Sequence, residues 1–336
     1  MALGASAQAP AEPRLTFGLT ADAHLLGRGA PQNEATVAGF VEEMCRWRPD
    51  FAIDMGDFGC QALPAEVPED AGKGVTTSAL HRAQLAGLEH HAAVFARVPC
   101  PRLHVLGNHD AGWLRGGGES ITAADLIGRS HPGEDITKDE VLRTNGMPHR
   151  YYARQVAGIL LIVLDANNEP DSEAPTPGHD GVQGAYYIDA EQRRWLKTLL
   201  AQHRTLSKLV FCHQELHHTP VSGSPEGGDV PFPVVGKEGS YVDNGWQIRE
   251  MFAEDGRVLA CFFGHKHRSR WASRHLTPLC LRRDRVPQVS LAGQVGGVWG
   301  HALPDDGGHP LGRLLCQDQL TGVAVADRWG WRTKEL

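Results

Sequence analysis

Residues 103–110 read LHVLGNHD, an apolar run that passes through Gly107 into an amide, an imidazole and a carboxylate on consecutive positions. Three consecutive polar side chains of this kind are not expected in a packed apolar core. Loops that follow strands are where an α/β protein places reactive groups, because the sheet holds them rigidly while the loop leaves them accessible. The stretch therefore predicts an α/β fold with a functional site at the ends of its strands.

The same pattern, an apolar run that ends in glycine or aspartate and then in metal-type ligands, occurs four more times along the chain. These four runs lead to Asp22 and His24, to Asp57, to His213, and to His265 and His267. Two ligands that lie two positions apart on an extended segment can point to the same side. Carboxylate, amide and imidazole donors from several strands are the set that two neighbouring cations need, with one carboxylate able to bridge them.

The order of these motifs, D-x-H, GD, GNHD, H and G-H-x-H, resembles the calcineurin-like metallophosphoesterase superfamily and spans residues 22–267. The finer pattern over 151–167 and 211–215 is similar to its bacterial branch, which contains cyclic-nucleotide phosphodiesterases and alkaline phosphatase-like proteins. The extended GDxVDRG motif of the protein Ser/Thr phosphatases is absent after Asp57. The resemblance implies an α/β fold, a four-layer α/β/β/α sandwich with two facing mixed β-sheets and a dinuclear metal site at the strand ends.

The resemblance also implies two divalent metal ions per chain, drawn from Mn, Fe, Zn or Co. One ion would be bound by Asp22, His24, Asp57 and His267, and the other by Asp57, Asn108, His213 and His265. His109 would then face the substrate phosphate, where it stabilises charge or protonates the leaving oxygen.

Other polar residues near these motifs receive different interpretations. Asp110 is grouped with the catalytic residues and is expected to anchor its loop by hydrogen bonds. Asn167 and His217 are the candidate substrate contacts. His90 and His91 lie on a predicted helix away from any strand end, so they are interpreted as a solvated face rather than as ligands.

The ligand set predicts a metal-dependent phosphoester hydrolase. Two cations lower the pKa of a bridging water from about 15.7 toward about 7, and the resulting hydroxide attacks phosphorus in line. Phosphodiester or pyrophosphate bonds of a small molecule are expected ahead of monoesters. The alternatives are a phosphomonoesterase of the same fold and a non-catalytic binding scaffold, which should have lost ligands that this chain retains.

Composition limits the partners and the organisation of the chain. The 336 residues could form one large domain or two of ordinary size, and a hydrophobic fraction of 41% is ample for a sizeable core. We expect a single domain over 14–336, after an Ala- and Pro-rich leader at 1–13 that is expected to be unstructured. The net charge of -7, from 33 basic and 40 acidic residues, argues against nucleic acid and favours a small-molecule phosphoester as the partner. No run approaches the roughly 18 apolar residues of a membrane span. We expect a cytoplasmic protein, or a periplasmic or secreted one if the start truncates an export signal; the oligomeric state is not predicted.

Hydrophobic periodicity predicts the elements at the start of the chain. Between strands expected at 15–20 and 51–55, an apolar stripe indicates a helix that is capped by Asn33 and ended by Pro49. The two strands should pair in parallel, because a crossover helix returns the chain to the same sheet edge.

Turn and capping signals predict the middle of the chain. Two apolar runs around 157–158 indicate a hairpin, and Asp189 with Gln192 indicates a capping box. The stretch 112–150 is interpreted as irregular, and strand-like runs without a clear helix are expected from residue 286.

Overall fold

Two mixed β-sheets carry the loops that the sequence singles out. The computed structural model describes residues 14–24, 30–58, 77–110, 136–168, 186–216, 242–265, 288–290, 313–317, 322–327 and 330–335. Within these residues one sheet has the order β11-β10-β9-β1-β2-β3, and the other has the order β4-β5-β6-β7-β8. The strands of the first sheet are β1 (Arg14–Thr20), β2 (Phe51–Asp54), β3 (Arg102–His104), β9 (Arg313–Gln317), β10 (Gly322–Asp327) and β11 (Gly330–Glu335). Those of the second are β4 (Tyr152–Val156), β5 (Ile159–Leu164), β6 (Lys208–Cys212), β7 (Val258–Phe263) and β8 (Gln288–Ser290).

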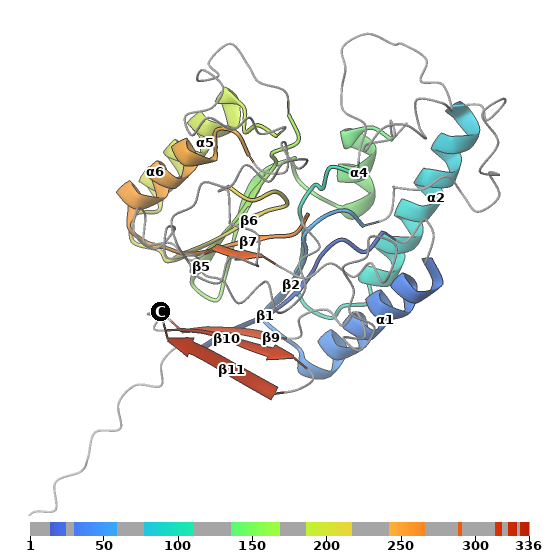
Figure 1. The fold of residues 1–336 in the computed structure, drawn as a ribbon, viewed down its shortest axis with the longest axis horizontal. Helices are drawn as coiled ribbons and strands as arrows, with labels where there is room; N and C mark the ends of the chain where they lie inside the picture. The colour runs from blue at the N-terminus through green and yellow to red at the C-terminus, as the bar shows by residue number, and fades with distance from the viewer. Residues whose placement is uncertain are drawn as a thin grey trace, which may run out of the picture.

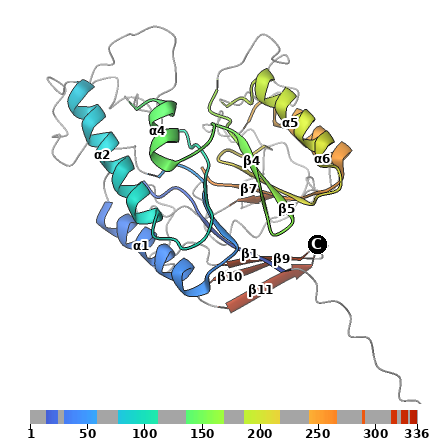
Figure 2. The ribbon, with the colours of Figure 1, turned by 180° about the vertical axis from the view of Figure 1, so that it is seen from behind.

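Helices cover the outer faces of the two sheets (Figures 1 and 2). The helices are α1 (Ala30–Trp47), α2 (Thr77–Phe95), α4 (Lys138–Asn145), α5 (Ala190–Gln202) and α6 (Gly245–Asp255). Phe40 of α1 and Phe95 of α2 pack with Ala52 of β2 in one buried cluster. Leu196 of α5 and Phe252 of α6 belong to a second cluster with the outward side chains of β5, β6 and β7. Each sheet is thus held to its own helices by a separate apolar core.

A third apolar cluster lies between the sheets and contains side chains from both of them. Phe17 of β1 stacks on Phe51 of β2 with ring centroids 4.8 Å apart, and it meets Phe211 and Phe262 of the other sheet edge-on. All four rings are fully buried, and burying one such side chain contributes about 1.5–3 kcal/mol. The sheets therefore face each other, and loops from both can reach a common edge.

The predicted β-α-β unit is confirmed, because β1 and β2 pair in parallel around α1. The apolar stripe of α1 is buried as expected, and the helix ends at Trp47, two residues before Pro49. The predicted N-cap was wrong: α1 begins at Ala30, so Asn33 lies inside the helix. Pro31 is tolerated there because the first turn of a helix leaves its N–H groups without intrahelical partners.

The predicted hairpin is also confirmed, since β4 and β5 pair antiparallel up to Val156 and Ile159. Its two turn residues have positive φ angles, 47° at Ala157 and 81° at Gly158. Positive φ at both central positions is the geometry that matches the right-handed twist of paired strands.

The expectation of an irregular stretch over 112–150 was wrong at its end, where α4 forms. Thr137 and Glu140 make a complete capping box at its start, and Gly146 ends it with a φ of 64°. Both are recognised sequence signals for helix ends, so this helix could have been predicted. The part at 111–135 lies outside the described residues.

The capping box predicted for α5 forms only in part. The Asp189 side chain accepts a hydrogen bond from the backbone N–H of Gln192 at 2.9 Å. The Gln192 side chain does not return to the cap, because it bonds the backbone of Asp165 instead, donating to the carbonyl at 2.7 Å and accepting from the N–H at 2.9 Å. A tertiary partner thus replaces the local one.

The strands β8 to β11 agree with the strand-like runs expected from residue 286. The predicted leader at 1–13 lies outside the described residues, so it stays a prediction. Among the described helices, none combines the length and apolar character that crossing a membrane requires.

Candidate metal centre

The loops that follow the parallel strands meet at one edge of the sheets. Asp22 follows β1, Asp57 follows β2 and Asn108 follows β3, while His213 and His265 follow β6 and β7 of the facing sheet. Parallel strands end on the same side, so five separate stretches of chain deliver their polar side chains to one place.

Backbone hydrogen bonds join these loops directly. The N–H of Asp22 donates to the carbonyl of Gly56 at 2.9 Å, and the N–H of His24 donates to the carbonyl of Asp57, also at 2.9 Å. The N–H of His265 donates to both carboxylate oxygens of Asp22, at 3.0 and 3.2 Å. The first, second and last of the five loops are therefore held together by bonds between protein atoms.

Four of the predicted ligand residues have left-handed backbone conformations. Their φ angles are 56° at Asp22, 43° at His24, 57° at Asp57 and 68° at His265. Such angles are uncommon for residues other than glycine and cost of order 1–3 kcal/mol each when they are strained. Their concentration at one edge of the sheets is the mark of a functional site.

Two glycines allow the second and third loops to approach each other. Gly56 has a φ of 97°, and a Cβ there would lie 2.5 Å from the backbone nitrogen of Gly107. A Cβ on Gly107 would overlap the Asp57 carboxylate and backbone nitrogen. No larger residue fits at Gly107 unless the Asp57 loop moves.

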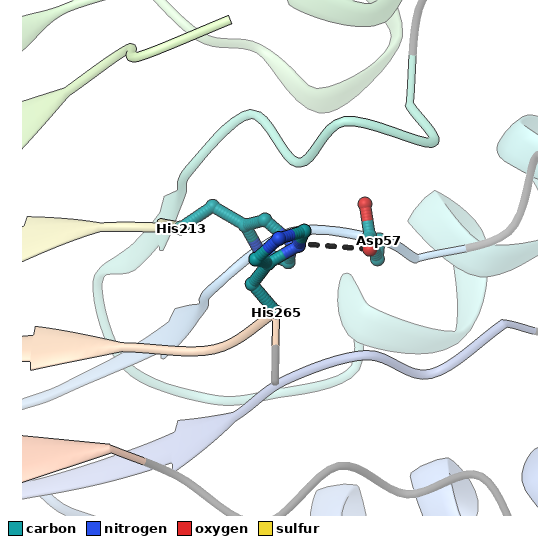
Figure 3. A group of neighbouring side chains, drawn as sticks. All are labelled: Asp57, His213 and His265. Atoms are coloured by element: carbon teal, nitrogen blue, oxygen red, sulfur yellow. Dashed lines mark ion pairs between the residues drawn. The ribbon is translucent and has the colours of Figure 1, made fainter. Parts of the chain in front are cut away.

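Asp57 is the centre of the site. Two groups of possible metal ligands share it: Asp22, His24 and Asp57, and Asp57, His213 and His265. In each group the ligand atoms lie within 4.8 Å of one another. Figure 3 shows the second group, in which His213 Nε2 lies 3.0 Å from Asp57 Oδ2. In the first group His24 Nε2 lies 3.8 Å from the same oxygen. One carboxylate oxygen thus faces both sets of donors.

The charges at this centre depend on one another. Burial raises the pKa of Asp57, but the imidazoles of His213, His109 and His24 outweigh it and hold that pKa well below the ordinary value. Burial lowers the pKa of His213, while the carboxylates of Asp57 and Asp22 raise it to about 10. Asp57 and His213 thus each favour the charged form of the other.

The donors fit a divalent cation. Asp57 Oδ2 and His213 Nε2 are both buried, and neither has a hydrogen-bond partner although they lie 3.0 Å apart. Buried polar atoms are nearly always hydrogen-bonded, so two such exceptions side by side are consistent with a site that binds an ion. Carboxylate oxygens with imidazole nitrogens suit Mn, Fe, Zn and similar ions.

The three consecutive polar residues of the 103–110 stretch take different positions. Asn108 is 1% exposed, and its Oδ1 lies 3.5 Å from the Gln214 amide nitrogen. The backbone N–H of His109 donates to Asp57 Oδ1 at 2.8 Å, and the His109 ring lies edge-on to the His24 ring with centroids 5.4 Å apart.

Asp110 has the anchoring bonds that were predicted for it. Its carboxylate accepts from the backbone N–H groups of Gly107 at 2.6 Å, Asp57 at 2.9 Å and Phe58 at 2.8 Å. Burial, and next the charge of Asp57, raise the pKa of Asp110 well above the ordinary value. The Asp110 carboxylate thus links the loop after β2 to the loop after β3 by hydrogen bonds.

Of the three remaining candidate residues, Asn167 is the one that lies within the described part of the chain. Asn167 is 8% exposed, and its amide bonds the Leu106 carbonyl and the side chains of Asp165 and Gln214. His217 and His267 lie outside the described residues, so their roles as substrate contact and metal ligand stay predictions.

The interpretation of His90 and His91 as a solvated face was right for one and wrong for the other. His90 is exposed and pairs with Glu34 at 2.9 Å. His91 is fully buried, stacks on Phe58 and lies 2.9 Å from the Asp54 carboxylate. The two side chains leave the helix in different directions. His91 points inward, to the carboxylate of Asp54 at the end of β2.

Comparison with known proteins rests on the fold. No family model and no curated protein matches the sequence. Among solved structures, a dimetal phosphatase from Danio rerio matches with a TM-score of 0.55 and 14% identity, over 96% of this chain and 99% of that one. The Plasmodium inner membrane complex anchor GAP50 matches with a TM-score of 0.48 and 13% identity, over 97% and 89%. A phosphopantetheinyl hydrolase from Mycobacterium tuberculosis matches with a TM-score of 0.40 and 12% identity, over 84% and 91%. The chain therefore shares the fold of a dimetal phosphatase.

Proposed function

We propose that this protein is a metal-dependent phosphoester hydrolase that cleaves phosphodiester or pyrophosphate bonds of a small molecule. The observation that carries the proposal is the pair of ligand groups that share Asp57. A carboxylate placed between two sets of nitrogen and oxygen donors is the arrangement expected of a bridging ligand. The fold shared with a dimetal phosphatase supports the same reading.

Each residue of the site has a role in this proposal. Asp22, His24 and Asp57 would hold one cation, with His267 completing that set. Asp57, His213 and His265 would hold the other, with Asn108 completing it. Cations bound there supply Lewis acidity toward the phosphoryl oxygens and a nucleophile of lowered pKa.

His109 is the imidazole of the site that is proposed to act on the substrate. Its backbone is fixed on Asp57, so its ring has a defined position beside that of His24. A donor there would stabilise negative charge on a phosphate oxygen or give a proton to the leaving oxygen.

The wider proposal concerns the chain as a whole. Residues 14–336 would form one domain with a four-layer α/β/β/α sandwich, which the three separate apolar clusters support. The net charge of -7 favours a small-molecule substrate over nucleic acid.

The test is a hydrolysis screen of the purified protein with Mn²⁺. Four substrate types should be compared: bis-p-nitrophenyl phosphate, p-nitrophenyl phosphate, cyclic nucleotides, and nucleotide diphosphate sugars or alcohols. Metal-dependent cleavage of diesters or pyrophosphates supports the proposal. Cleavage of the monoester alone would identify a phosphomonoesterase of this fold, and no cleavage with both metals bound would identify a binding scaffold.

Two variants sharpen the screen. Asp57→Asn should abolish hydrolysis and lower metal occupancy from two ions per chain to one or none, measured by elemental analysis. Asp139→Asn changes an exposed aspartate on α4 and should leave both unchanged.

A further inference from the structure

A buried chain of amides leads from the candidate metal centre to helix α4. Gln214 follows His213 directly and is fully buried. Its amide nitrogen donates to Asn167 Oδ1 at 2.6 Å and lies 3.5 Å from Asn108 Oδ1. Asn108 belongs to the loop after β3, whereas Gln214 follows β6, so this one side chain spans the gap between the two sheets.

Asp165, which is fully buried, sets the orientation of the side-chain amides of Asn167 and Gln214. An ionised carboxylate can only accept, so the Asn167 side chain must turn its nitrogen toward Asp165 Oδ1, 3.2 Å away, and the Leu106 carbonyl, 2.8 Å away. The Asn167 side-chain oxygen then faces Gln214, so Gln214 must donate to it through its amide nitrogen. That nitrogen is consequently aimed at Asn108.

Asp165 is held as a carboxylate by cations from elsewhere in the chain. Lys138, the first residue of α4, donates to Asp165 Oδ2 at 2.7 Å and to the carbonyl of Asn167 at 2.6 Å. Arg150 lies 3.3 Å from the same carboxylate oxygen. Burial raises the pKa of Asp165, but Lys138 and then Arg150 outweigh it, so the pKa lies below the ordinary value.

From this geometry we infer that Gln214 is a positioning residue, which orients the Asn108 side-chain oxygen toward the cation that Asp57, His213 and His265 would hold. A carbonyl oxygen has two lone pairs, so Asn108 Oδ1 can accept from Gln214 and still present the other lone pair to an ion. The inference rests on the proposed function. It adds a role for Gln214 and makes Asp165 and Asn167 the residues that set its orientation.

The alternative is that the amides merely fill a buried polar gap. Removing a purely structural side chain lowers stability and weakens both cation sites alike. Removing a side chain that orients one ligand weakens the site of that ligand alone, and such partners of a ligand typically change metal affinity about 10–100-fold.

The experiment measures Mn²⁺ binding to the metal-free protein by isothermal titration calorimetry, with the number of bound ions checked by electron paramagnetic resonance. Gln214→Met keeps the length of the side chain and removes its donor. We expect one of the two binding events to weaken about 10–100-fold and the other to change by less than about threefold, while Gln202→Met, on an exposed glutamine of α5, changes neither.

A double-mutant cycle shows whether Gln214 acts through Asn108. Asn108→Ala alone should weaken the same binding event, and adding Gln214→Met to it should cause no further loss. Additive losses, or equal losses at both sites, would overturn the inference. If Gln214→Met does not fold, Asn167→Leu removes the acceptor that orients Gln214 and should weaken the same event.

Failure of this inference differs from failure of the proposed function. Wild-type protein that binds fewer than two Mn²⁺ ions would contradict the dinuclear proposal itself. Two ions in the wild type with unchanged affinities in Gln214→Met would leave the proposed function intact and remove the role of Gln214.

Discussion

Replacing Asp110 by alanine should destabilise the protein more than most single changes can. The Asp110 carboxylate is fully buried and accepts from three backbone N–H groups, two on Oδ2 and one on Oδ1. Leaving one buried N–H unsatisfied costs about 1–3 kcal/mol. Because burial and the charge of Asp57 raise the pKa of Asp110, desolvation of the carboxylate offsets part of the gain, and we expect a loss of about 3 kcal/mol.

Asp110→Asn should cost less, for a reason visible in the bonding. An amide oxygen at the Oδ2 position can keep the bonds from Gly107 and Asp57, but the amide nitrogen then faces the N–H of Phe58. One bond of three is lost, so the expected cost is about 1–2 kcal/mol.

Urea denaturation of the metal-free protein measures both losses, because a shift of the midpoint at constant slope reports stability. Asp139→Ala, on the exposed start of α4, is the control and should change stability by less than about 1 kcal/mol. A loss below about 1 kcal/mol for Asp110→Ala, or equal losses for both Asp110 variants, would refute the anchoring role.

The same variants separate an anchor from a catalytic residue. If Asp110 acts by holding the Asp57 loop, Asp110→Asn should weaken metal binding and regain kcat at saturating Mn²⁺. A kcat that stays low with both metals bound would instead place Asp110 in contact with the substrate.

Further expectations concern the imidazole, the close glycine and the buried carboxylate. His109→Asn should lower kcat by about 10²–10⁴ while both metals are retained. The loss of kcat should be smaller for p-nitrophenyl esters than for alkyl esters, and the control His90→Asn should have no effect. Kinetics combined with metal analysis tests this. Gly107→Ala should displace Asp57 and lower the affinity for both ions in a Mn²⁺ titration, and unchanged affinity would show that the loop can yield. Asp165→Asn should lower stability at pH 7, because a carboxyl whose folded pKa lies below its unfolded value of about 3.9 stabilises the fold above that value. The difference from wild type should vanish as the pH falls through the folded pKa, which urea denaturation at pH 7, 5 and 3 follows; a constant difference would contradict the ionic role.

The strand ends could be predicted from sequence because their signal is local. An apolar run that stops at a glycine or aspartate and continues with ligands, as before Asp57 and Asn108, contains both the strand and its loop. Parallel pairing then brings such loops to one edge whatever the details of packing. Asp57 belongs to both groups of possible ligands, and its bridging role stays a prediction.

The amide chain could not be predicted, because each of its bonds joins residues far apart in sequence. Gln192 illustrates the difficulty: the local pattern predicts a return to its own helix cap, and the side chain bonds Asp165 instead. His91 is similar, since it is buried beside the Asp54 carboxylate, which comes from a different element of the fold. By contrast, the capping box of Thr137 and Glu140 is a local signal, so the sequence alone is enough to predict the start of α4.

The backbone at the predicted ligands indicates that the fold itself sets the geometry of the candidate metal centre. Asp22, His24, Asp57 and His265 have positive φ angles, which persist only where surrounding structure enforces them. The enforcing bonds run between protein atoms, from one ligand loop to the next and from the loops to Asp110. Side chains fixed in this way would need little rearrangement to bind an ion, which would favour tight binding of a cation. The proposed role of Gln214 extends the same principle from backbone to side chain, because its amide nitrogen lies 3.5 Å from the Asn108 side-chain oxygen and would help to orient it.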